Sequence, residues 1–404
     1  MLRIILLCAL VCLLLGPATF GQDPNSLDAK ERKRAAEQLA GQGVDAIPQL
    51  QKLLSDKDLD VRIEAVKSIV EIDTQHSLDP LIQATRDNDP EIQIRATDGL
   101  VNFYLPGYLR TGFTASLRRA GRGIKGKFTD TNDQVIDSFV EVRPEVIEAL
   151  GRLARGGSSM ESRANAARAA GILRGKAAVP DLLQAVRSKD SQVICECLVA
   201  LQKIRDQSAG PQVSFLLKDL DKRVQVAAIE TAGLLYNQEA LPQLRQVLRQ
   251  TGKKDVRRAA LGAIAMLRDP ADRDLFKSYL RHKDEELRES AAEGLGRAGD
   301  KEDLQILEQR FEEERDNSAR NSVAFALVML GKTDMSELGP FRYLVNTLNS
   351  SVRMGEARGL LMEAARKTEV RRALEQPLMR GTASERMYLS QVMAVSGDKE
   401  TIPL

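Results

Sequence analysis

The residue types that usually perform chemistry are sparse in this sequence and too far apart to work together. The two histidines, His76 and His282, lie about 200 residues from each other. A catalytic triad needs its side chains within hydrogen-bond reach, and no motif here brings a nucleophile to a base. Carboxylates are plentiful, but none stands in an apolar stretch that would predict a raised pKa. The sequence predicts no catalytic residue and no cofactor, so we expect a protein that is not an enzyme.

Two short motifs resemble ligand-binding motifs, but each lacks a residue that the ligand site requires. Gly121–Lys127 has the spacing of a phosphate-binding loop, but Phe128 stands where Ser or Thr would hold magnesium. Asp130–Asp133 resembles the start of a calcium loop, yet Gln134 and Val135 replace the next ligand and the required glycine. We expect this acidic run to cap a helix that starts near Gln134. Neither motif predicts a nucleotide or metal site.

Residues 103–143 have a composition unlike the rest of the chain. Between Leu109 and Phe128 there are six basic residues and no acid, and residues 103–128 hold five of the sixteen aromatic residues. Aromatic and arginine side chains are enriched where proteins bind one another. The candidate partner-binding residues are Tyr104, Tyr108, Arg110, Phe113, Arg118, Arg119, Arg122, Lys125 and Lys127.

Three interpretations of residues 103–143 stay open. The stretch is an arm that binds a protein partner, or it lies on an anionic membrane surface with its basic residues over the headgroups. The third interpretation is an elaboration that packs on the rest of the fold and leaves its charges in water. Binding to anionic vesicles that depends on Arg118, Arg119 and Arg122 would separate the second from the others.

The elements that must position this stretch form a repeat, and Val179–Gln207 is its clearest copy. Pro180 suits the first turn of one helix, and apolar residues follow at helical spacing. Polar residues around Asp190 break the pattern and supply caps for a second helix that carries its own apolar stripe. Two helices of this length cannot bury their apolar faces alone, whereas stacked copies can.

The repeat can be counted from the residue that opens each second helix. The openers are Val61, Ile92, Ser162, Val193, Val224, Val256, Leu287, Ala319, Gly355 and Glu385. Most steps are 31 or 32 residues, and the long step from Ile92 to Ser162 is one period plus about 39 inserted residues. Small or apolar residues follow four positions later, and prolines mark first helices at Pro48, Pro80, Pro180, Pro211 and Pro242. We predict an all-α fold, a right-handed α-solenoid of about ten stacked helix pairs with one non-repeat insertion.

The motif Ala-Ile-Pro-x-Leu, a polar turn, then Asp-Val-Arg-x-x-Ala, as in Asp60–Ala65 and Asp255–Ala260, resembles the HEAT-repeat family in its short bacterial, phycobilisome-lyase-type form. The resemblance covers nearly all of residues 22–404 and implies a solenoid of stacked helix pairs. The family includes iron hydroxylases with repeated His-Glu pairs, but Ser77 and Lys283 follow the histidines here. It also includes chromophore lyases, which leaves a lyase-like enzyme as a lesser alternative.

Arginine recurs directly after the opener. Asp or Glu in neighbouring turns would pair with these arginines and form a ladder that orients the repeats, although each exposed pair contributes only about 0–1 kcal/mol. The ladder residues are Arg62, Arg163, Arg257, Arg288 and Arg320. A stripe that binds a polyanion is the alternative. The charge runs Glu312–Arg315 and Lys283–Glu286 are interpreted as solvated turns.

The first 21 residues predict export. Arg3 precedes an apolar run of twelve residues, Ile4–Leu15, which is shorter than the roughly 20 residues of a membrane-spanning helix. Small residues at Thr19 and Gly21 offer a cleavage site before Gln22. We expect a signal peptide over 1–21 and the periplasm as destination, with secretion, membrane association or an uncleaved anchor as alternatives. The remaining chain, 22–404, is expected to hold an N-terminal cap at 27–43 and degenerate repeats at 340–404.

The cysteines and the net charge argue against a disulfide framework and against nucleic acid as the partner. Cys195 and Cys197 are two apart on one predicted helix and face different sides, so they suit a core better than a disulfide. The net charge of +2 argues against a nucleic-acid binder, which would be strongly basic. We therefore predict an exported, non-catalytic scaffold that binds a protein through the solenoid groove and the 103–143 arm. The main alternative is a peripheral membrane scaffold, and no small-molecule substrate is evident.

Overall fold

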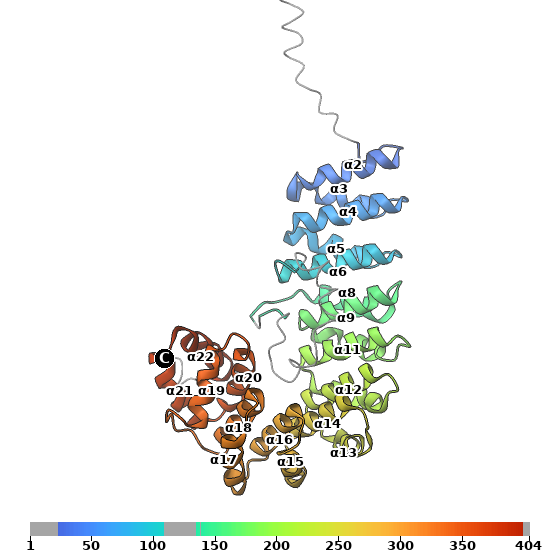
Figure 1. Cartoon of the computed structure of the whole chain (residues 1–404). Coiled ribbons are helices and arrows are strands. Elements are labelled where there is room, and N and C mark those ends of the chain that lie inside the picture. The colour runs from blue at the N-terminus through green and yellow to red at the C-terminus, as the bar shows by residue number, and fades with distance from the viewer. Residues whose placement is uncertain (1–22, 109–134, 138, 399–404) are drawn as a thin grey trace, which may run out of the picture. The chain divides into compact units, whose positions relative to one another are not determined.

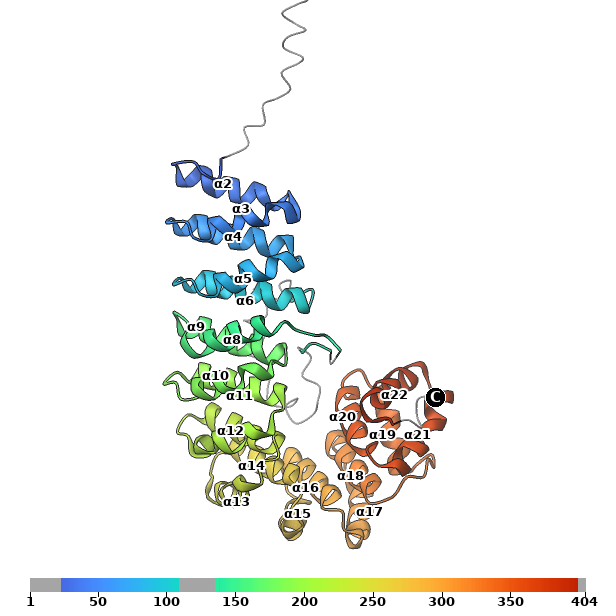
Figure 2. The same ribbon diagram turned by 180° about the vertical axis from the view of Figure 1, so that it is seen from behind.

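The structure is a computed structural model that describes residues 23–108, 135–137 and 139–398. Every regular element among these residues is a helix, as the sequence predicts. The chain divides into two compact units. The first unit contains the chain up to Leu109 with Gly157–Ser162, and the second contains Arg110–Gly156 and Arg163–Leu404. Within each unit, consecutive helix pairs stack on one another (Figures 1 and 2).

In the first unit the second helices of successive pairs form one layer. Helix α2 packs on α4, and α4 packs on α6, while the shorter α3 and α5 lie against the same neighbours. The helices are α2 (Ala29–Ala40), α3 (Ile47–Leu53), α4 (Leu59–Ile72), α5 (Leu78–Ala84) and α6 (Pro90–Tyr104). At the start of the stack, Arg32 of α2 pairs with Asp56 at 2.6 Å in the turn before α4.

The second unit continues the same order of short first helices and longer second helices. Helices α12, α14, α16, α18, α20 and α22 pack in sequence, which gives one layer of second helices. The helices are α8 (Pro144–Gly156), α9 (Met160–Ile172), which starts in the first unit, α10 (Val179–Ala185), α11 (Ser191–Ile204), the 3-10 helix η7 (Pro211–Lys218), α12 (Lys222–Leu234), α13 (Leu241–Gln250), α14 (Lys254–Leu267), α15 (Arg273–Tyr279), α16 (Glu285–Ala298), α17 (Leu304–Glu313), α18 (Asn317–Met329), α19 (Pro340–Asn346), α20 (Met354–Ala364), α21 (Thr368–Arg380) and α22 (Ala383–Ser396).

The predicted repeat agrees with the helices. Each of the ten openers is the second or third residue of a second helix, and the five marker prolines fall in the first turns of first helices. Eight of the openers, from Val61 to Ala319, are at most 1% exposed. The spacing of 31 or 32 residues between openers therefore reflects burial between stacked helices. These openers enter the core where one helix pair packs on the next. The fold class is confirmed as an all-α solenoid, while its superhelical hand stays a prediction.

Second helices start at aspartate caps. The Asp190 carboxylate accepts a hydrogen bond from the backbone N–H of Val193 at 2.9 Å, as the polar turn predicts. Asp58, Asp89, Asp221, Asp284 and Asp316 cap other second helices in the same way. A cap satisfies N–H groups that a helix start leaves without partners. The last pair differs, because Thr382 and Glu385 form a reciprocal capping box, which explains a glutamate at an opener position.

Small residues let neighbouring second helices approach closely. A Cβ added at Gly171 would lie 2.7 Å from the Cα of Ala200 on the next second helix. Gly233 and Gly296 stand at the same place in their repeats and would meet Ala263 and Ala326 at 2.8 and 2.6 Å. No side chain fits at such distances, so glycine is required nine residues after the opener in these copies.

The insertion lies between the end of α6 at Tyr104 and the start of α8 at Pro144. Residues 109–134 and 138 lie outside the described residues, as do the predicted signal peptide and the P-loop-like motif. The helix expected near Gln134 is wrong, since residues 135–137 and 139–143 are not helical. The free Cys197 is buried in α11, and this burial raises the pKa of its thiol. Among the described helices, none combines the length and apolarity that a bilayer crossing requires.

Candidate functional site

The layer of second helices carries a half-buried polar cluster in the second unit, on α16, α18 and α20. We call it the second-helix cluster. It consists of Glu289, Glu293, Arg297, Asn321, Ser322, Glu356 and Glu363. Helices α14, α16, α18 and α20 pack side by side in this order, so residues far apart in sequence meet on one face. The apolar stripes of these helices turn into the core and leave the opposite positions for polar side chains.

At one end of the cluster, Arg297 joins two helices. Its guanidinium lies 2.9 Å from Glu293 on α16 and 2.8 Å from Glu363 on α20, and its side chain is only 4% exposed. Arg268 also reaches Glu363 at 3.0 Å. Burial alone would raise the pKa of Glu363, but the attraction of Arg297 outweighs it and the pKa falls below its usual range. This end of the cluster is therefore charged, paired and closed.

At the other end, Glu289 and Glu356 form no ion pair among the described residues, although the charge of Arg353 lowers the pKa of Glu356. Burial, together with the charges of Glu356 and Glu293, raises the pKa of Glu289 to about 9. Burial also raises the pKa of Glu356 to about 7, although hydrogen bonds from Ser318 and Asn321 lower it. Among the residues that the structure describes, Glu289 forms no hydrogen bond or ion pair. At neutral pH Glu289 holds a proton and Glu356 is partly ionised.

Helix α18 fixes the polar groups between these two ends. Asn321 is fully buried, donates from Nδ2 to Glu356 at 3.2 Å, and accepts at Oδ1 from the Thr347 hydroxyl at 3.1 Å. Ser322 donates to Glu293 at 3.0 Å. These bonds hold the side chains in place before any partner arrives. Chemically, the cluster offers oriented carboxyl groups that would accept a lysine or arginine side chain.

Of the predicted partner-binding residues of the 103–143 arm, the structure describes only the two at its N-terminal end, Tyr104 and Tyr108. Tyr104 is half-buried and its ring meets Phe103 edge to face, with centroids 5.0 Å apart. Tyr108 is 6% exposed. The other seven candidates, Arg110, Phe113, Arg118, Arg119, Arg122, Lys125 and Lys127, lie outside the described residues.

The predicted ladder arginines take three different partners. Arg62 reaches Asp87 of the next turn at 2.9 Å, and Arg288 reaches Glu314 of the next turn at 2.8 Å. Each also donates to a backbone carbonyl of the preceding turn. These two arginines tie a turn to its neighbour, which is the geometry expected of a ladder.

The remaining ladder positions differ. Arg163 and Arg257 donate to the carbonyls of Ala154 and Thr251 at the end of the preceding helix, at 3.1 and 2.9 Å. Arg320 lies over two aromatic rings, with its guanidinium carbon 4.4 Å from the Phe311 centroid. In place of Arg257, the neighbouring Arg258 pairs across repeats, at 2.8 Å from Asp284.

Sequence reasoning missed Glu289 and Glu356, and it was wrong about one residue in each of two charge runs interpreted as solvated turns or faces. Glu314 and Asp284 belong to runs interpreted as solvated turns, but they are 4% and 8% exposed. The signal for the cluster is the spacing Glu286, Glu289, Glu293, which places like charges three and four residues apart on one helix face, with the opposite charge of Arg297 four residues further on. Such a row is unfavourable in isolation, so it indicates a role beyond helix stability.

Comparisons with known proteins agree with the repeat pattern. A family model described as HEAT repeats matches residues 24–101, 211–277 and 244–328. The CpcE–CpcF complex of phycocyanin lyase from Nostoc sp. PCC7120 shares 19% identity over 66% of this chain and 92% of that chain, with a TM-score of 0.39. YibA of E. coli shares 17% over 75% and 98% (TM-score 0.42), and importin beta shares 17% over 92% and 60% (TM-score 0.40). No curated protein matches the sequence.

Proposed function

We propose that this chain, in which a HEAT-repeat model matches residues 24–101 and 211–328, is an exported, non-catalytic scaffold that binds another protein through its layer of second helices. Stacked repeats present an extended surface on which contacts at several repeats can add. The observation that carries the proposal is Glu289, a half-buried carboxyl without a cation beside a partly ionised Glu356.

A basic side chain of the partner would complete this end of the cluster as Arg297 completes the other. Ionising Glu289 alone is costly because burial and neighbouring carboxylates oppose it. A partner lysine or arginine would supply the opposite charge, lower the pKa and release the proton. Binding should therefore strengthen as the pH rises from 6 to 9, by up to tenfold per pH unit when one proton is released.

The arm at 103–143 would add a second contact. Its described edge lies directly after α6, and its basic and aromatic residues have the composition of a protein-binding segment. A partner that carries acidic side chains would pair with the arm, while its own basic residues would pair with Glu289 and Glu356. We expect the Arg118→Ala/Arg119→Ala/Arg122→Ala variant to weaken binding without abolishing it.

Export forms part of the same proposal, because residues 1–21 have the pattern of a signal peptide. The N-terminal sequence of the protein recovered from the periplasm should begin at Gln22. Recovery in the cytoplasm with Met1 retained would contradict export and leave the binding proposal in place.

The test uses partner capture from a cell-envelope extract by the full chain and by the Glu289→Gln/Glu356→Gln variant. Glutamine has the shape of a protonated glutamic acid, so we expect the variant to fold and to lose the pH-dependent part of binding. Glu239→Gln/Glu369→Gln makes the same two substitutions at exposed positions and serves as the matched control. A partner that both variants capture equally at every pH would contradict the role of the cluster. Binding to anionic vesicles that the Arg118/Arg119/Arg122 variant loses would favour the membrane hypothesis.

A further inference from the structure

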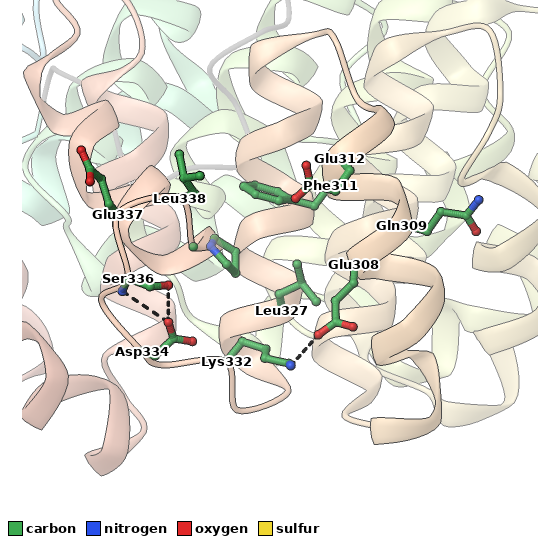
Figure 3. Close-up of a pocket in the computed structure, with 12 residues that line it drawn as sticks. Glu308, Gln309, Phe311, Glu312, Leu327, Lys332, Asp334, Ser336, Glu337 and Leu338 are labelled. Atoms are coloured by element: carbon green, nitrogen blue, oxygen red, sulfur yellow. Dashed lines mark hydrogen bonds and ion pairs between the residues drawn. The ribbon is translucent and has the colours of Figure 1, made fainter.

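A groove with a cavity volume of about 770 Å³ lies between α17 and the loop that joins α18 to α19 (Figure 3). Leu327, Phe311 and Pro340 line it, although Leu327 and Phe311 are themselves only 1% and 3% exposed. Leu338 of the loop is 89% exposed, although a leucine side chain is usually covered. The groove therefore offers an apolar surface together with one aliphatic side chain that the described residues leave in water.

Acidic side chains surround this apolar surface. Glu308, Glu312, Asp334 and Glu337 line the groove together with a single cation, Lys332. Lys332 pairs with Glu308 at 2.5 Å, so that pair is neutral. The Asp334 carboxylate accepts from the Ser336 hydroxyl, and this bond lowers its pKa (Figure 3).

Two of the carboxylates have no partner among the described residues. Glu312 comes from α17 and Glu337 from the loop, both are exposed, and neither forms a hydrogen bond or an ion pair there. The whole chain has a net charge of +2, so this acidic surplus is a local feature of the groove. A negative potential of this kind attracts cations and repels anionic lipid or nucleic acid.

We propose that the groove docks a protein segment in which an aliphatic or aromatic side chain is flanked by lysine or arginine. The apolar side chain would cover Leu338 and the apolar surface, and the flanking cations would pair with Glu312 and Glu337. Apolar contact supplies affinity and the charges select the segment, as in other peptide-binding grooves. The groove involves a first helix and a loop, so it is a contact separate from the second-helix cluster and does not depend on it.

The test measures fluorescence anisotropy of a labelled peptide, Lys-Arg-Leu-Arg-Phe-Lys, titrated with the full-length protein. Two control peptides replace its basic residues with Gln or its apolar residues with Ser. We expect saturable binding of the first peptide only, with affinity falling as salt rises. Glu312→Gln/Glu337→Gln should weaken binding about fivefold to tenfold, and Leu338→Ser about fivefold.

Matched variants keep these effects specific. Glu239→Gln/Glu369→Gln removes two exposed charges elsewhere, and Leu220→Ser changes another leucine that is 94% exposed, so both should bind the peptide as the unchanged protein does. Glu289→Gln should also retain peptide binding, which separates this proposal from the proposed function.

Three results would overturn the proposal. The first is equal binding of the Gln-substituted peptide, and the second is unchanged affinity in the Glu312/Glu337 variant. The third is peptide binding that emerges only after the basic residues of 110–127 are replaced with Gln, because the chain itself would then occupy the groove.

Discussion

Two glutamates of the second unit, the buried Glu314 and the half-buried Glu289, have pKa values shifted in opposite directions. Glu314 lies in the turn between α17 and α18 and accepts from Arg288 and Arg310 at 2.8 and 2.6 Å. Burial raises its pKa, but these hydrogen bonds outweigh burial and lower the pKa to about 2. Glu289 lies on α16, and burial raises its pKa to about 9.

The difference teaches that burial alone does not decide the state of a carboxyl group in this fold. Both side chains lose hydration, which favours the protonated form. In its turn, the guanidinium groups of Arg288 and Arg310, from two adjacent helices, restore the charge of Glu314. On the second-helix layer the nearest groups of Glu289 are other carboxyls, so its proton stays. Glu314 is thus paired by arginines of its own repeat array, whereas Glu289 forms no ion pair among the described residues.

The largest expected effect comes from opening the closed end of the cluster. Arg297→Ala would leave Glu293 and Glu363 buried with only Arg268 beside them. Removing one partner of a buried pair typically costs about 3–5 kcal/mol. We expect the urea midpoint of the full chain to fall accordingly. Arg297→Lys should recover part of the loss, because lysine keeps the positive charge but lacks the planar guanidinium that binds two carboxylates at once.

An Arg297→Ala variant with the stability of the unchanged protein would show that the pair contributes nothing net. In that case the contrast between the closed and open ends of the cluster would lose its energetic meaning.

The sequence predicted the repeat because its determinants are local. Val193 follows its cap Asp190 by three residues, and Gly233 follows its opener by nine, so one copy of the repeat contains both signals. Glu289 could not be recognised in this way. Its pKa depends on Glu356, which lies two repeats later and is brought near by the packing of α16, α18 and α20.

The charge runs failed for the same reason. From the sequence, Asp284 is part of a solvated turn. In the structure, the guanidinium of Arg258 from the previous repeat lies 2.8 Å from its carboxylate and covers it. Burial raises the pKa of Asp284, yet hydrogen bonds from Arg258 and Lys254 bring it down to about 2. Contacts between repeats therefore determine which acidic side chains are buried and paired. The sequence of a single repeat does not reveal these contacts.

The next effect is a pH dependence. The folded pKa of Glu289 lies above the value of about 4.5 for an ordinary glutamate, so the folded protein binds the extra proton. Stability from this group is complete below pH 4.5 and falls as the pH rises toward 9, by at most about 1.4 kcal/mol per pH unit. Urea unfolding from pH 5 to pH 8 should show this decline, and Glu289→Gln should flatten it.

A decline that Glu289→Gln leaves unchanged would assign the proton to another group. Glu356→Gln is the comparison, because its pKa of about 7 confines its contribution to the lower part of the same range.

A smaller effect, of opposite sign in pH, belongs to the turn. Glu314→Gln removes the charge that Arg288 and Arg310 share, and we expect a loss of about 2 kcal/mol at pH 7. The folded pKa of about 2 lies below the ordinary value, so the stabilisation is present above pH 4.5 and disappears as the pH falls toward 2. The variant should therefore lose less stability than the unchanged protein on acidification. Parallel acid curves would contradict this assignment.

The smallest effect is expected where a charged pair links repeats but stays in water. Lys222 lies 2.7 Å from Asp255, and the two side chains are 52% and 31% exposed. Water screens both charges, so Lys222→Ala should change the free energy of unfolding by no more than about 0.5 kcal/mol. A double-mutant cycle with Asp255→Ala measures the coupling, and addition of 1 M salt should abolish it. A coupling as large as that of Arg288 with Glu314 would mean that position in the repeat, and not burial, sets the strength of these pairs.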